Sequence, residues 1–167
     1  MIVSSVFLKL TGEKSGEIKG SSVQRGREGL IPVLGLNHSI RVPVDLASGL
    51  GAGKRQHQPI IITKEVDQTS PKLDQVLVTN ERIKEAILTF YGPFANSPRN
   101  PGAEQKLYTI TLKKAWITEI QVSLKSMIEL KNQPGNFVEN IFFVYDEIVW
   151  HWETPSIESA DQWGTSQ

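Results

Sequence analysis

Apolar and polar residues alternate along much of the chain, and the longest such run spans residues 137–152. Successive side chains of a strand point to opposite faces, so the first half of this run is apolar on both faces. One face carries Ile141, Phe143 and Tyr145, and the other carries Phe142 and Val144. A domain core covers one of these faces, and the other needs cover from a second subunit or from a helix. Ile141, Phe143 and Tyr145 are therefore candidate subunit-interface residues.

Further strands are predicted by shorter apolar or β-branched runs, which are separated by segments rich in turn residues. These runs are 2–10, 30–44 (one or two strands), 60–64, 107–112 and 116–124. In the last of them Trp116, Ile120, Val122 and Leu124 are expected to share one face. The run 137–152 also becomes one-sided after Asp146, with Ile148, Trp150 and Trp152 on its apolar face. This pattern predicts a mainly β protein, either a sandwich or a barrel.

One short helix interrupts the strands. Ser70 and Pro71 are a helix start signal, because the hydroxyl can cap the helix and proline lacks only an N–H that the first turn leaves unbonded. Leu73, Val76 and Leu77 then fall on one helical face. We expect a helix that ends near Val78, followed by a strand from about residue 84.

Two long segments carry no periodicity. Residues 46–59 contain Ser48, Gly49, Gly51 and Gly53, and a loop of this length in a compact domain is either functional or mobile. Residues 92–104 carry three prolines and are irregular. The chain therefore reads as a single domain over residues 1–153, with a polar, frayed tail over residues 154–167.

Composition narrows the class of protein. With 18 Lys+Arg and 18 Asp+Glu the formal net charge is zero, which argues against nucleic acid or an anionic membrane as main partner and suits self-association. There is no cysteine, so neither disulfides nor thiolate chemistry are available. The first ten residues lack a basic leader, and no apolar run approaches the roughly 20 residues that span a bilayer. We expect no signal peptide and no membrane insertion.

The sequence offers no convincing catalytic or metal-binding motif. Gly53 and Lys54 are followed by Arg55, and Ser48 replaces the first glycine of a phosphate-binding loop. The histidines, at 38, 57 and 151, lack the spacing of zinc ligands. Five aromatic residues could stack sugars, but aromatic residues at the spacing of a strand are more often part of a core. They are Trp116, Phe142, Phe143, Trp150 and Trp152. We expect no catalytic residue, no metal and no cofactor.

Several motifs together resemble the Hcp family, the haemolysin-coregulated proteins of the bacterial type VI secretion system. The most distinctive is Gly53-Lys54-Arg55-Gln56-His57, which leads into Thr63-Lys64-Glu65-Val66-Asp67 and Ser70-Pro71-Lys72-Leu73. Phe7-Leu8-Lys9-Leu10 resembles the family's opening strand, and residues 141–152 resemble its closing strand. The resemblance covers nearly the whole chain.

The resemblance implies a phage-tail-tube-like barrel of two antiparallel sheets with one short helix at its side. It also implies six subunits in a ring and rings stacked into the inner tube of the secretion system. The implied partners are further copies of the chain, a VgrG-type spike, a contractile sheath and small effectors in the lumen. Such a protein is cytoplasmic before assembly and is then secreted to the extracellular space or a target cell.

A ring-stacking role is expected for the glycine-rich loop, through Leu46, Ser48, Gly49, Gly51, Gly53, Lys54, Arg55 and His57, with the last three making polar contacts to the next ring. The alternative is a carbohydrate- or ligand-binding β-sandwich that uses the aromatic residues. An enzyme is the third and least supported hypothesis.

Overall fold

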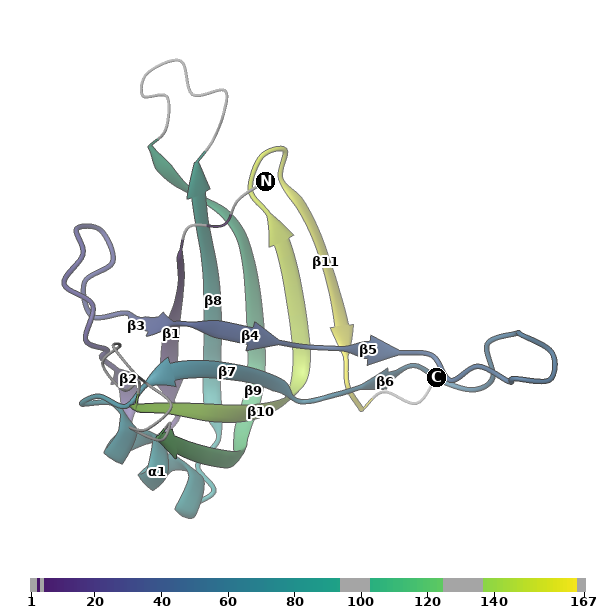
Figure 1. The fold of residues 1–167 in the computed structure, drawn as a ribbon, viewed down its shortest axis with the longest axis horizontal. Coiled ribbons are helices and arrows are strands. Elements are labelled where there is room, and N and C mark those ends of the chain that lie inside the picture. Colours follow the sequence, from purple (N-terminus) through teal and green to yellow (C-terminus); the bar gives the residue numbers. More distant parts are fainter. Residues whose placement is uncertain (1–2, 4, 94–102, 125–136, 165–167) are drawn as a thin grey trace, which may run out of the picture.

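A computed structural model describes residues 3, 5–93, 103–124 and 137–164. Within these residues it contains eleven strands and one helix (Figure 1). The first strands are β1 (Ser5–Gly12), β2 (Gly16–Ile18), β3 (Ile31–Val33), β4 (Gly35–Asn37), β5 (Ile40–Arg41), β6 (Gln56–His57) and β7 (Ile60–Glu65). They are followed by α1 (Ser70–Val78), β8 (Ile83–Pro93), β9 (Glu104–Leu124), β10 (Phe137–Trp152) and β11 (Ile157–Gln162). The prediction of a mainly β protein with one short helix is confirmed.

The strands pair in antiparallel fashion, and nine of them form one sheet. Its order is β2-β1-β8-β9-β10-β7-β4, with β11 paired to β10 and β3 paired to β1. The consecutive strands β3 and β4 pair with β1 and β7 respectively, so residues 31–37 run from the β1 side of the sheet to the β7 side. The remaining two strands, β5 and β6, form a separate small sheet.

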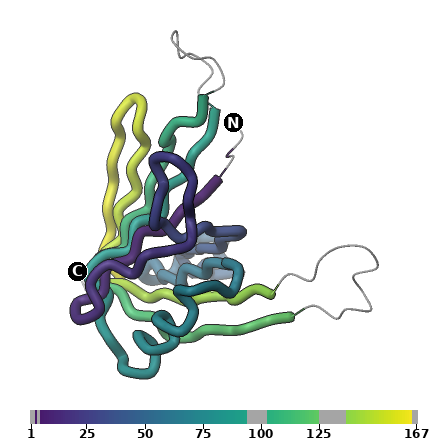
Figure 2. Tube along the Cα trace, turned by 90° about the vertical axis from the view of Figure 1, so that its left-hand side faces the viewer, coloured from purple at the N-terminus to yellow at the C-terminus, as the bar shows by residue number. Residues whose placement is uncertain are grey.

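The long strands β9 and β10 bend and so belong to two layers. The first half of β10 pairs with β7, whereas its second half pairs with β11. Figure 2 shows both strands changing direction between an upright and a horizontal course. Close to the bend Lys114 adopts a φ of 50°, which is uncommon for a residue with a side chain. One bent strand therefore replaces the two strands predicted at 107–112 and 116–124.

A bulge in β9 overturns one predicted face. The register with β10 shifts between Phe142 and Phe143, which leaves Thr118 as an extra residue in β9. An extra residue reverses the alternation of the side chains that follow it. Ile117 is consequently in the core, and Ile120 packs against the same core. The prediction that Trp116 and Ile120 share a face was wrong for this reason.

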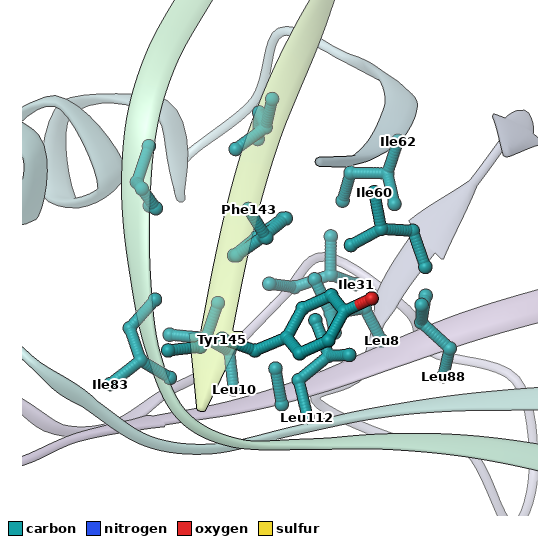
Figure 3. Close-up of a cluster of buried hydrophobic side chains, with 14 of the residues drawn as sticks. Leu8, Leu10, Ile31, Ile60, Ile62, Ile83, Leu88, Leu112, Phe143 and Tyr145 are labelled. Carbon is teal, nitrogen blue, oxygen red and sulfur yellow. The ribbon is translucent and has the colours of Figure 1, made fainter. Parts of the chain in front are cut away.

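The core fills the space between the layers (Figure 3). Ile141, Phe143 and Tyr145 are only 0%, 1% and 3% exposed, respectively. Side chains this buried within one chain have no surface left to give to a second subunit, so these three residues are core residues rather than interface residues. The opposite face of β10, with Phe142 and Val144, stays partly exposed. The doubly apolar pattern is present, and the three candidate interface residues lie on its core-facing side.

Helix α1 lies at one end of the layers and buries Leu73 and Val76, as its apolar spacing predicted (Figure 1). Its N-cap is Thr69 rather than Ser70. Just before the helix, Asp67 Oδ1 accepts the Thr69 backbone N–H at 2.8 Å. The nine-residue helix, which is the single helix in the part of the chain that the structure describes, is too short to cross a membrane.

The C-terminal segment is a strand, which corrects the expectation of a frayed tail. Residues of β11 pair with the second half of β10 from Glu147 to Trp152. Beyond the strand, the Trp163 backbone N–H donates to the Asp146 carbonyl at 2.8 Å, and the indole packs against the core. Backbone pairing and one aromatic anchor hold a segment whose other side chains are mostly exposed.

Candidate functional site

The most prominent surface feature is the hairpin of residues 38–59, named the arm below, which projects from the sheets (Figure 1). At its base β5 pairs with β6, through Ile40 with His57 and Arg41 with Gln56. Farther out, Val44 forms a bridge with Gly51. The segment that looked like an aperiodic loop is therefore a hydrogen-bonded hairpin.

Asp45 organises the tip of the arm. Its carboxylate accepts the Ala47 backbone N–H at 3.0 Å and the Ser48 hydroxyl at 2.9 Å. These bonds lower the pKa of Asp45, the bond from the Ala47 N–H contributing most. Gly49 and Gly53 have φ angles of 69° and 95°, a region in which residues with a Cβ are strained. The glycines thus supply turn geometry at defined positions.

Apolar side chains of the arm point into solvent. Leu46 is 96% exposed and Leu50 is 69% exposed. The same holds for three residues of the first limb, Ile40, Val42 and Val44, which are 36% to 56% exposed. Single exposed apolar residues are ordinary, but five on one projecting hairpin form a surface that favours a protein contact.

At the base of the arm, His57 is buried and holds two partners. Its Nδ1 lies 2.8 Å from the Tyr145 hydroxyl, and its Nε2 lies 2.8 Å from Asp161 Oδ2. The imidazole also stacks on Trp163, with ring centroids 5.7 Å apart. His38, at the start of the arm, brings its Nε2 within 2.8 Å of the same Tyr145 hydroxyl. Both limbs of the arm therefore meet at one core tyrosine.

Asp161, on β11, is the anionic partner of this base. Arg55 binds it with two nitrogens, Nη2 lying 2.7 Å from Oδ1 while Nε contacts Oδ2. The same Nη2 donates to the Gln162 carbonyl at 3.3 Å. The Arg55 guanidinium is the main reason why the pKa of Asp161 falls to about 2, and the bond to His57 lowers it further. Asp161 is therefore a carboxylate at any physiological pH.

The polar groups at the base are joined in one hydrogen-bonded chain. The Asp161 carboxylate accepts a hydrogen bond from His57 Nε2–H, and the Tyr145 hydroxyl bonds both His57 Nδ1 and His38 Nε2. Burial, and next the charge of Asp161, raises the pKa of Tyr145. Burial, and next the proximity of His57, lowers the pKa of His38. The network joins both limbs of the arm to the core.

The residues expected in the ring-stacking loop divide into two groups. Leu46, Ser48, Gly49, Gly51, Gly53 and Lys54 lie in the exposed outer arm. Arg55 and His57, which were expected to make polar contacts to the next ring, lie at the base of the arm, and both contact Asp161 of the same chain. No local pattern marks Asp161, Tyr145 or Trp163 as their partners, because the bonds to Tyr145 and Asp161 join residues 88 and 106 positions apart.

Other chemistry suggested by the sequence is dispersed. His151 lies on β10 beside the β11 turn, away from the base of the arm, and donates to or accepts from Ser156 at 2.8 Å. Within the described ranges, no three His, Asp or Glu side chains gather as metal ligands would. The aromatic set is split, because Phe143 and Trp150 pack in or against the core while Phe142 lies on the opposite face.

Comparison with known proteins identifies the family. Residues 7–152 match the family model described as "Type VI secretion system effector, Hcp". The chain is 29% identical to a Pseudomonas aeruginosa protein named "Major exported protein", over 97% of this chain and 96% of that one. It thus belongs to the class of mainly β proteins of type VI secretion. More specifically, it is a member of the Hcp family.

Solved structures agree with this assignment. A double mutant of Hcp1 from E. coli EAEC 042 superimposes with a TM-score of 0.82, at 26% identity, covering 96% of this chain and 99% of that chain. The secreted protein Hcp3 from Pseudomonas aeruginosa gives a TM-score of 0.73, also at 26% identity and with the same coverage. An Hcp structure at 23% identity has a TM-score of 0.85, which concerns the fold alone.

Proposed function

We propose that this chain is a structural subunit of the type VI secretion inner tube, in which six copies close a ring and the arm joins one ring to the next. The observation that carries the proposal is the arm itself: a hairpin fixed at its base, with five uncovered apolar side chains. Such a hairpin reaches beyond its own domain and meets a neighbour without first having to fold.

Closure of the ring is assigned to the outer face of the layer formed by β7 and the first half of β10. Ile61, Phe142, Val144 and Trp116 lie there, partly exposed, on the face opposite the core. A stable subunit contact buries roughly 800 Å² on each partner, more than one hairpin limb offers. A broad apolar sheet face therefore suits the ring contact, and the narrow arm suits stacking.

The proposed function is non-enzymatic. The Asp161, His57 and Tyr145 side chains follow one another like a proton relay, but Tyr145 is 3% exposed and sits in the core. A substrate has no access to a hydroxyl that already bonds two imidazoles. The proposal also includes expulsion with a VgrG-type spike on sheath contraction and transport of small effectors in the lumen, and membership of the family supports both.

Shortening the arm tests the proposal. Residues 48–54 are replaced by a short Gly-Ser turn, which leaves Arg55 and His57 in place. Light scattering should still give the mass of six subunits, while electron microscopy should find no tubes and secretion should be lost. A second variant, Leu46→Ser with Leu50→Ser, keeps the length of the arm and removes its apolar contacts. It should also reduce tube formation.

Two results would contradict the proposal. A parent protein that runs as a monomer at micromolar concentration and moderate salt would exclude the ring. A shortened variant that falls apart to monomers would place the arm in the ring contact instead of the stacking contact. Independently, Phe142→Glu should break the ring, and intact hexamers in that variant would refute the assigned ring face.

A further inference from the structure

We propose that Asp161 of β11 is a positioning residue for the arm, so that the C-terminal strand sets the direction in which the arm leaves the body. This inference rests on the proposed stacking role of the arm. It assigns to β11 a task in assembly that is separate from completing the sheet.

The backbone alone leaves the arm free to swing. Its two strands form a sheet of their own, and among the described residues this sheet has no ladder to the nine-stranded sheet. Only residues 38–39 and 58–59 connect the arm to β4 and β7. One hydrogen bond, from the Gln58 N–H to the Ser39 carbonyl at 3.1 Å, ties these two connections to each other rather than to the body. A two-stranded hairpin held in this way is marginally ordered by itself.

Side chains supply the missing attachment, and they converge on Asp161. Arg55 brings a planar fork that matches both carboxylate oxygens, a geometry that fixes direction as well as distance. His57 binds Asp161 from the buried side, with its own side chain 1% exposed. Two side chains of one limb thus bind one carboxylate from different sides, which removes rotation about the two connections.

The contacts to Tyr145 do not replace this restraint. Tyr145 offers one hydroxyl, shared by His38 and His57, and a single shared atom permits pivoting. Without the carboxylate, His57 Nε2–H would be buried with no acceptor, at the cost that an unpaired buried donor carries. The second point of attachment, 25% exposed on β11, therefore determines the angle of the arm.

The test compares substitutions at Asp161 in the full chain. Asp161→Asn keeps the shape and removes the charge, and Asp161→Glu keeps the charge. Glu158→Gln, an exposed change on the same strand, is the matched control. Hydrogen exchange of peptides covering residues 38–59 reports arm mobility, light scattering reports the ring, and electron microscopy reports tubes.

In Asp161→Asn the backbone amides of the arm should exchange about five- to tenfold faster than in the parent. The yield of tubes should fall by a similar factor, while hexamers persist. Asp161→Glu should recover most of both effects, and Glu158→Gln should match the parent. If Asp161→Asn fails to fold, Arg55→Gln removes the same bond from the side of the arm. The same measurements are then made on that variant, with the same expected results.

Unchanged arm exchange in Asp161→Asn or Arg55→Gln would overturn the inference, whatever happens to tubes. A mobile arm with normal tubes would also overturn it. In that second case the variant with the shortened arm separates the two proposals. If this variant forms no tubes, the stacking role of the arm stands and only the role of Asp161 is refuted. If it still forms tubes, the stacking role itself is refuted.

Discussion

Removing the ammonium of Lys64 should destabilise the protein more than neutralising Glu139, although the two side chains form one buried ion pair. Lys64 lies on β7 and Glu139 directly opposite on β10. Nζ is 2.6 Å from Oε1, and both side chains are 1% exposed. A charge left alone in such a place costs far more than the intact pair contributes.

The difference follows from the partners that each group keeps. Without Glu139 the ammonium still has the Glu65 carbonyl at 2.6 Å and Asp67 Oδ1 at 3.1 Å. Without Lys64 the carboxylate keeps the Ser70 hydroxyl at 2.7 Å. We therefore expect Lys64→Met to lower the free energy of unfolding by about 3–5 kcal/mol. Glu139→Gln, which retains an acceptor oxygen, should cost about 1–3 kcal/mol.

The double variant Lys64→Met with Glu139→Leu should be less destabilised than Lys64→Met alone, because no charge remains buried. Urea unfolding, at one protein concentration and with the oligomeric state confirmed for each variant, measures these values. The exposed pair Lys113 and Glu147, 3.5 Å apart, serves as control, and Lys113→Met should cost less than about 1 kcal/mol. A double variant no more stable than Lys64→Met alone, or a larger loss for Glu139→Gln than for Lys64→Met, would refute the reasoning.

Three further predictions concern other parts of the chain. Trp150→Ala should cost about 3 kcal/mol in chemical denaturation, since the ring packs against the core but stays partly exposed; a loss below 1 kcal/mol, on the order of a surface change, would contradict its packing. Arg27→Lys should cost about 1–2 kcal/mol, because the guanidinium lies 3.7 Å from the Tyr91 ring centroid and lysine lacks that flat face; equal melting temperatures would count against the stacking. The pKa of Asp161, about 2, lies below its ordinary value of 3.8, so its stabilisation is complete above pH 3.8 and is lost as pH falls toward 2. The difference in melting temperature between the parent and Asp161→Asn should accordingly shrink across that interval. A difference that stays constant would exclude the Asp161 carboxylate as the source of the stabilisation.

Local sequence signals predicted the elements that local interactions determine. The helix at Ser70–Val78 was readable because Ser70-Pro71 marks its start and Leu73 and Val76 recur at helical spacing. The strand at Ile60–Glu65 was readable from its β-branched run. In each case the residues that form the signal lie within a few positions of one another, and this is the range over which a sequence pattern carries information.

The failures have physical causes of longer range. Nothing near Thr118 indicates that an extra residue will enter the ladder with β10, and so the face of Trp116 was misassigned. The strand at Ile157–Gln162 has almost no buried side chain and is held by backbone pairing, which leaves no apolar pattern to read. The bond from Arg55 to Asp161 joins residues 106 positions apart, and charged residues carry no mark of their partners.

The arm illustrates how composition misleads when turn geometry is ignored. Its glycines suggested a soft loop, yet Gly49 and Gly53 occupy backbone conformations that only glycine adopts without strain, and Asp45 closes the tip. Ordering a loose segment costs about 1–2 kcal/mol of conformational free energy for each residue fixed. An arm that is already folded in the free subunit avoids this cost when it contacts a partner. In the proposed tube every added ring would repeat that cost in each subunit, so a pre-formed arm anchored through Arg55 would favour assembly more than a flexible loop of the same length.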